Sequence, residues 1–158
     1  MPNTRSLLRV ARRLTSDTAS AEDLVQETLL LAWRGLHQFR AGSNVRAWLF
    51  RILFNEFHGR ARKPWATVST VPLSFDSQRT QPSVEQAVEM SQALDNLSLE
   101  HRTVLLLGIV EGFTSQEISD ILSVPIGTVM SRLSRARQAL RDQLTAAPRY
   151  KCASEEAS

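Results

Sequence analysis

A stretch rich in proline, serine and threonine near the middle of the 158-residue chain constrains the fold more than any other feature. Residues 64–83 contain three of the six prolines and no apolar repeat of helical or strand period. Such composition is typical of a linker, and an unstructured connector of about twenty residues is unusual inside one compact domain. The sequence therefore predicts two small domains, residues 1–63 and 84–146, followed by a polar tail over residues 147–158.

The segment before the linker has the spacing of three helices. Apolar side chains three and four positions apart predict a helix over residues 4–15. Ser20 and Asp23 have the shape of a capping box for a second helix that ends near Gly35. Asn44 is suited to cap a third helix. The predicted core stripes are Val25, Leu29, Ala32, Trp33 and Leu36 in the second helix, and Val45, Trp48, Leu49, Ile52 and Leu53 in the third.

The segment after the linker predicts four helices. The first spans residues 84–97, and the second begins after Ser98 and stops at Gly112. Thr114 and Glu117 form a capping box for a short third helix, and a turn containing Pro125 leads into a last helix over residues 126–144. Two helices joined this way, the second with arginines on its outer face, have the layout of a helix-turn-helix. No strand pattern is present, so the expected fold class is all-α.

Composition excludes several classes of function. The three histidines lack metal-ligand spacing, and the single cysteine, Cys152, rules out a disulfide framework or a Cys-ligated zinc site, so we expect no metal, no cofactor and no enzyme activity. The longest uncharged apolar run, residues 103–110, is too short to span a membrane, and the first residues do not resemble a secretory signal. We therefore expect a cytoplasmic protein.

The charges are unevenly distributed along the chain. Before residue 67 there are 11 Lys and Arg against 5 Asp and Glu, whereas residues 67–100 contain 1 against 5. The basic first block favours an anionic partner, or is simply a solvated basic face.

The outer face of the last helix predicts contact with a DNA groove. Arg135 lies opposite the apolar stripe and can donate to guanine in the major groove. Arg132 and Arg137 flank it and suit backbone phosphates. The alternative is a plain basic helix on a helical bundle. The outward set is Gly127, Met130, Ser131, Ser134, Arg135 and Gln138, and the apolar stripe is Val129, Leu133, Ala136, Leu140 and Leu144.

Two further patterns in the first block suggest binding surfaces. The third helix interleaves aromatic with basic and polar residues, which suits stacking of unpaired bases. Alternatively, the aromatic side chains are buried in the core of the bundle, and we expect at least one of the three phenylalanines to be buried there. Asp23 and Glu27 lie one turn apart and suggest either a docking patch for a basic protein or carboxylates that stabilise a helix N-terminus. The interleaved residues are Phe50, Phe54 and Phe57 with Arg51, Asn55, His58 and Arg62.

Three segments together resemble the extracytoplasmic-function (ECF) sigma factors of bacterial RNA polymerase, within the sigma-70 family. They are AEDLVQETLLLAW (21–33), FRAGSNVRAWLFRILFNEF (39–57) and EGFTSQEISDILSVPIGTVMSRLSRARQALR (111–141). The run NVRAWLFRILFNEF is also similar to the alphaproteobacterial general-stress branch. The resemblance implies a sigma2-like domain, a linker and a sigma4-like domain. Members usually have further helix before LLRVARRLT, and many have a basic residue where Met130 stands.

The resemblance also implies partners and site residues. Core polymerase would be bound through the clamp helices of its largest subunit and the flap of its second-largest subunit. Promoter DNA would be melted at the minus-ten element and read at the minus-thirty-five element. An anti-sigma factor would regulate the protein. The implied polymerase-binding residues are Asp23, Leu24, Gln26 and Glu27. The implied minus-ten residues are Phe39, Arg40, Asn44, Trp48, Arg51, Asn55, His58 and Arg62, and the implied minus-thirty-five residues are Thr128, Met130, Ser131, Arg132, Ser134, Arg135 and Arg137.

Two rival functions belong to other classes. A free-standing helix-turn-helix regulator explains the second block but leaves the aromatic helix and the acidic patch without a role. A sigma-like decoy that only sequesters an anti-sigma factor keeps the fold and dispenses with DNA contacts. Retention of Asn55, Arg135 and the DLVQE stretch favours an active sigma factor over the decoy.

Overall fold

The computed structural model describes residues 2–61 and 84–146, and every regular element in those ranges is helical. The all-α class is therefore confirmed, whereas the predicted linker, the tail and Arg62 lie outside the described residues. The elements are α1 (Pro2–Leu14), α2 (Thr18–Arg34), the 3-10 turn η1 (Leu36–Gln38), α3 (Val45–Ala61), α4 (Val84–Asp95), α5 (Leu99–Leu105), the π-helical turn η2 (Leu106–Val110), α6 (Ser115–Leu122) and α7 (Ile126–Ala146).

Helix α2 begins earlier than the sequence predicts. Its N-cap is Asp17, whose carboxylate accepts hydrogen bonds from the Ser20 backbone amide at 2.8 Å and the Ser20 hydroxyl at 2.7 Å. These hydrogen bonds, the hydroxyl's foremost, lower the pKa of Asp17. Ser20 therefore lies inside the first turn, and the predicted capping box of Ser20 with Asp23 is wrong.

The core face of α2 also differs from the predicted stripe. The buried residues are Ala21, Leu24, Val25, Thr28 and Ala32. The buried Thr28 hydroxyl has a hydrogen-bond partner within the helix, because it donates to the Leu24 carbonyl at 2.7 Å. Leu29, Leu36 and above all Trp33, which is 76% exposed, lie on the surface instead. The buried face of α2, which contacts α1 and α3, therefore combines Leu24 and Val25 with three smaller residues, and the predicted stripe is only partly correct.

Helix α3 is the centre of the molecule. Phe50, Leu53 and Phe54 are at most 1% exposed, and Leu49 is also buried. Of the other residues in the predicted stripe, Trp48 and Ile52 are half-buried and Val45 is exposed. A helix that is apolar on more than one side must pack on more than one side, and α3 contacts α1, α2 and α6. The prediction that at least one phenylalanine is core is confirmed for two of them.

In the second block, the helices are capped and ended by the residues that the sequence predicts. The Ser98 hydroxyl caps α5, and Thr114 and Glu117 form both hydrogen bonds of a capping box at the start of α6. Ser123, at φ 55°, makes the left-handed turn between α6 and α7. The sequence does not reveal η2, in which the Glu111 amide donates to the Leu106 carbonyl five residues back at 2.9 Å. Gly112, at φ +73°, then ends the helix.

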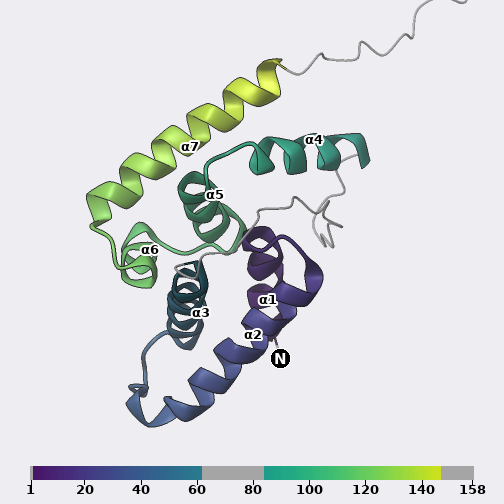
Figure 1. The fold of residues 1–158 in the computed structure, drawn as a ribbon. Coiled ribbons are helices and arrows are strands. Elements are labelled where there is room, and N and C mark those ends of the chain that lie inside the picture. Colours follow the sequence, from purple (N-terminus) through teal and green to yellow (C-terminus); the bar gives the residue numbers. More distant parts are fainter. Residues whose placement is uncertain (1, 62–83, 147–158) are drawn as a thin grey trace, which may run out of the picture.

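The two helical bundles pack against one another. Figure 1 shows α1, α2 and α3 grouped together, with α4 to α7 stacked over one end of this group. The junction is formed mainly where α3 meets α6, and the buried apolar residues of both bundles form one continuous cluster. At its centre the Phe50 and Phe113 rings meet edge to face with centroids 5.3 Å apart. The domains are thus in a closed arrangement.

Candidate polymerase and DNA interface

The predicted polymerase surface lies on the first half of α2. Asp23 and Gln26 are exposed and Glu27 is half-buried, so these three polar side chains are available on one side of the helix. Leu24 is completely buried. The structure therefore places Leu24 in the core, where it orients the polar residues of α2 rather than contacting a partner.

An apolar surface continues from this acidic patch along α2 and into η1. Leu30 is 42% exposed, Trp33 76% and Leu36 53%. Exposed aromatic and aliphatic side chains gathered next to charged groups are typical of protein interfaces. Sequence reasoning assigned Trp33 and Leu36 to the core and so missed this surface; the run of small residues at positions 21, 28 and 32 is the signal that indicates the true core face.

The predicted minus-ten loop is held at both ends. Gly42 has φ +90°, a conformation that other residues rarely adopt. Asn44 caps α3 as predicted, its side-chain oxygen accepting from the amides of Arg46 at 3.1 Å and Ala47 at 3.2 Å. The Phe39 and Trp48 rings lie 5.1 Å apart between centroids, and both residues are half-buried. Phe39 directly precedes Arg40, which is exposed.

Along α3 the structure separates the polar residues from the aromatic ones. Arg51, Asn55 and His58 are all exposed. Phe50 and Phe54 are buried, so the interpretation in which they stack on unpaired bases is wrong. Phe57 is half-buried, with its ring 5.7 Å from that of His58. The exposed side chains of this part of α3 are therefore the polar row of Arg51, Asn55 and His58.

The last two helices have the geometry expected of a helix-turn-helix. Val129, Leu133 and Ala136 are buried against α5 and α6, which fixes the rotation of α7. The predicted outward face is exposed as expected; Met130 is 58% exposed. The minus-thirty-five candidates Ser131, Ser134, Arg135 and Arg137 are exposed, while Thr128 and Arg132 are half-buried. Arg132 pairs with Glu100 at 3.1 Å, so it reaches DNA only by exchanging that partner.

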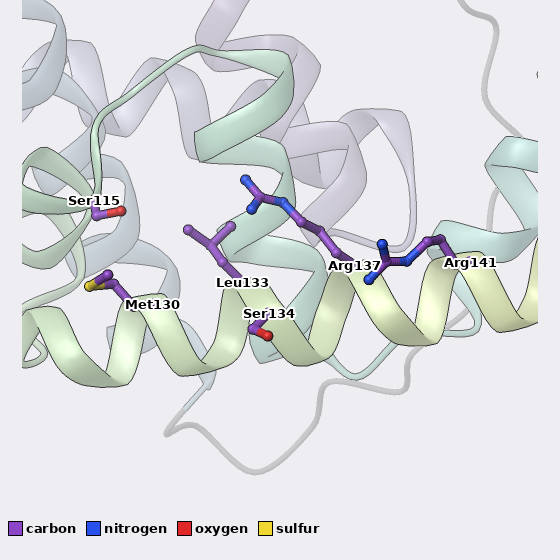
Figure 2. Close-up of a pocket in the computed structure, with 6 residues that line it drawn as sticks. All are labelled: Ser115, Met130, Leu133, Ser134, Arg137 and Arg141. Carbon is purple, nitrogen blue, oxygen red and sulfur yellow. The ribbon is translucent and has the colours of Figure 1, made fainter.

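A shallow groove runs between the start of α6 and one side of α7. Figure 2 shows Met130, Ser134, Arg137 and Arg141 following one another along α7, with Ser115 of α6 across from the Met130 end of this row. Two guanidinium groups and two hydroxyls, one of them Ser115 at the first position of α6, are suited to a backbone phosphate. Sequence reasoning missed Ser115 and Arg141; the spacing 130, 134, 137 and 141 along one helix face is the signal that finds Arg141.

Metal-binding constellations are not found in the described parts of the chain. No group of three His, Cys, Asp or Glu side chains there is placed to hold a metal ion. None of the helices described is long and apolar enough to cross a membrane. The exposed features described above are a polar and apolar face on α2, a polar row on α3 and a basic face on α7.

Comparison with known proteins places these surfaces in one family. Residues 1–67 match the model for Sigma-70 region 2, and residues 87–140 match that for Sigma-70 region 4. The chain is 37% identical over 139 residues to the ECF RNA polymerase sigma factor EcfG of Rhodopseudomonas palustris, covering 85% of this chain and 77% of that protein. It is 39% identical over 144 residues to SigL of Mycobacterium tuberculosis, covering 85% of this chain and 80% of SigL.

A solved structure extends the comparison to the arrangement of both domains. The sigma factor RpoE of Bartonella quintana, crystallised in complex with the anti-sigma factor NepR, is 33% identical and superposes with a TM-score of 0.77, covering 92% of this chain and 94% of that one. Because both bundles contribute to that score, they are similarly placed in the two proteins. The chain belongs to the ECF sigma factors of the sigma-70 family.

Proposed function

We propose that this protein binds core RNA polymerase and directs it to promoters, without catalysing a covalent step itself, in the cytoplasm. Asp23, Gln26 and Glu27 of α2 would dock on the clamp helices, with Trp33 extending the contact. The loop before α3 and the polar row of that helix would open the minus-ten element. Helix α7 would read the minus-thirty-five element, and the second bundle would contact the polymerase flap.

The observation that supports this proposal most is the combination of exposed surfaces in one chain. A DNA-binding regulator needs the basic face of α7 alone, whereas here α2 also exposes carboxylates beside a tryptophan that is 76% exposed. A surface of that kind fits a protein partner. Polymerase docking and DNA reading are therefore both accounted for, which the free-standing regulator does not achieve.

We further propose that an anti-sigma factor binds this protein. The support comes from two structural relatives: RpoE of Bartonella quintana was solved with the anti-sigma factor NepR, and CnrH, which is 26% identical with a TM-score of 0.65, was solved with the cytosolic domain of CnrY. Both matches span at least 90% of this chain.

Reconstitution with core polymerase tests the proposal. The purified protein is added to core enzyme with fragmented genomic DNA, and the RNA 5′ ends are sequenced. We expect a set of start sites absent with core enzyme alone and sharing two upstream elements. Binding to core enzyme without any start sites would favour the decoy, and sequence-specific binding to duplex DNA without core enzyme would favour the regulator.

A further inference from the structure

The junction between the two bundles contains a carboxylate that is completely buried. The side chain of Glu111, which follows η2 in the second bundle, is 0% exposed. Its oxygens accept from Arg9 Nε of α1 at 3.0 Å and from Arg46 Nη2 at the start of α3. Arg46 Nη1 also donates to the Glu111 backbone carbonyl at 2.7 Å. One carboxylate thus joins two helices of the first bundle to the second.

The local backbone structure directs the side chains of Glu111 and Phe113 into this junction. The π-helical turn η2 and Gly112, at φ +73°, turn the chain so that both Glu111 and Phe113 are buried. The Arg46 guanidinium lies 4.6 Å from the centroid of the Phe113 ring, within the range of a cation–π contact. Arg46 is therefore held by a carboxylate, a carbonyl and an aromatic ring, all from the second bundle.

A second carboxylate makes a similar contact next to the first. Glu117 Oε1 of α6 accepts from Asn44 Nδ2 at 2.9 Å. Asn44 and Arg46 are the loop end and first turn of α3, where the proposed minus-ten surface begins. The partners that Glu111 and Glu117 provide, anionic oxygens on a cation and an amide, are those that DNA phosphates provide to the same side-chain types.

The closed arrangement conflicts with simultaneous reading of both promoter elements, a step that depends on the proposed function. Elements centred about 25 base pairs apart lie about 85 Å apart along B-form DNA at 3.4 Å per base pair. In this structure α6 contacts Asn44 directly, and α7 packs on α6, so its axis lies about 10 Å further away. The two bundles must separate before α3 and α7 reach their elements together.

We infer that Glu111, assisted by Glu117, is an internal latch that occupies Arg46 and Asn44 in place of DNA phosphate and holds the protein closed. A buried charge is stable only while its partners remain, so closure requires Arg9 and Arg46 together with Glu111. When the bundles separate, all three groups become hydrated and Arg46 becomes available to nucleic acid. Closure and DNA binding therefore compete for the same side chains.

The test removes the latch charge while keeping its shape. Full-length Glu111→Gln is compared with wild type and with Glu22→Gln, which removes one negative charge from an exposed position on α2. Small-angle X-ray scattering measures the radius of gyration. Fluorescence anisotropy measures binding to a labelled 20-nucleotide DNA single strand of mixed sequence, at fixed salt. Circular dichroism checks that each variant keeps its helices.

We expect Glu111→Gln to increase the radius of gyration by several ångströms and to bind the DNA strand about fivefold tighter or more, because the apparent affinity rises as the competent fraction rises. Arg46→Ala added to Glu111→Gln should remove most of the gain in affinity. Glu22→Gln should match wild type in size and change affinity less than twofold. If Glu111→Gln unfolds, Glu117→Gln, at a half-buried position, is measured instead, with the same direction and a smaller effect expected.

An unchanged radius of gyration and an unchanged affinity in the folded variant would overturn the latch. A gain in affinity that persists after Arg46→Ala would overturn the competition for Arg46. These readouts do not use polymerase, so the latch can hold even if the reconstituted protein starts no transcripts, and it can fail while transcription succeeds.

Discussion

Separate replacement of Arg135 and Arg137 by alanine distinguishes reading of bases from contact with phosphates on α7. Both side chains are exposed on the same helix, so removal of either costs little folding free energy. Arg135 lies away from the buried stripe of Val129 and Leu133, on the outward face. Arg137 instead lines the groove between α6 and α7. The two substitutions remove the same charge at different positions relative to DNA.

The expected magnitudes follow from these positions. A bidentate contact with a base edge discriminates by about 1–3 kcal/mol, which corresponds to roughly 5- to 160-fold in affinity. Arg135→Ala should therefore weaken binding to the cognate element by that factor. The substituted protein should also bind DNA elements that differ at one or two base positions almost as well as the cognate element. A phosphate contact contributes a slope of about −0.9 in log K against log salt, so the effect of Arg137→Ala should shrink about 3.5-fold between 50 and 200 mM salt.

The assay measures binding of each variant in complex with core polymerase to a promoter mapped by transcript sequencing. A panel of single-base changes across the minus-thirty-five element is titrated at several salt concentrations. Uniform loss of affinity with Arg135→Ala, together with relaxed sequence preference with Arg137→Ala, would refute the assigned orientation of α7. No effect of either substitution would refute DNA contact by this helix.

Three further predictions concern the other surfaces. Asp23→Lys with Glu27→Lys should abolish co-purification with core polymerase without loss of helical content, because like charges across an interface cost several kcal/mol; retained binding would contradict docking by α2. Asn55→Ala should slow open-complex formation on linear duplex, with rescue on a pre-melted template, because a held base contributes roughly 1–3 kcal/mol; equal defects on both templates would indicate a folding role. The pKa of Glu117 is lowered, first by the hydrogen bond from the Thr114 amide. The ionised Glu117 side chain therefore stabilises the folded protein at neutral pH. This contribution is lost as the pH falls below about 4, where an ordinary glutamate is already becoming protonated. Glu117→Gln should therefore flatten the acid decline of the urea midpoint between about pH 5 and pH 3, and an unchanged slope would count against this role.

Elements set by local chemistry are the ones that the sequence predicts well. Asn44, Ser98 and the pair of Thr114 and Glu117 all cap helices as expected, because a cap needs only a short side chain and the backbone amides two or three residues later. The start of α2 is the exception. Asp17 and Ser20 are both competent caps three residues apart, and the aspartate forms two short hydrogen bonds where the serine would form one.

Features set by contacts between distant residues could not be predicted in this way. Phe50 is core because Phe113, 63 positions later, packs on it, and no periodicity within α3 reveals that neighbour. Trp33 is exposed because α2 packs on α1 and α3 through a different face, which contains Leu24, Val25 and Thr28. The exposed face of α7 was predictable, since a single apolar stripe on that helix leaves one possible orientation.

The contacts at the start of α3 explain why the site and the closed arrangement are linked in this fold. Asn44 uses its side-chain oxygen to cap α3 and its side-chain nitrogen to reach Glu117, so it can keep the cap while it exchanges Glu117 for another acceptor. Arg46 lies two residues later and contacts the second bundle through both terminal nitrogens. Helix α3 itself is fixed by buried Phe54 and Leu53, and it therefore stays formed when these polar contacts are exchanged. On the proposed latch, opening exchanges the partners of Asn44 and Arg46 and also separates the Phe50 and Phe113 rings, while helix α3 keeps its own helical structure.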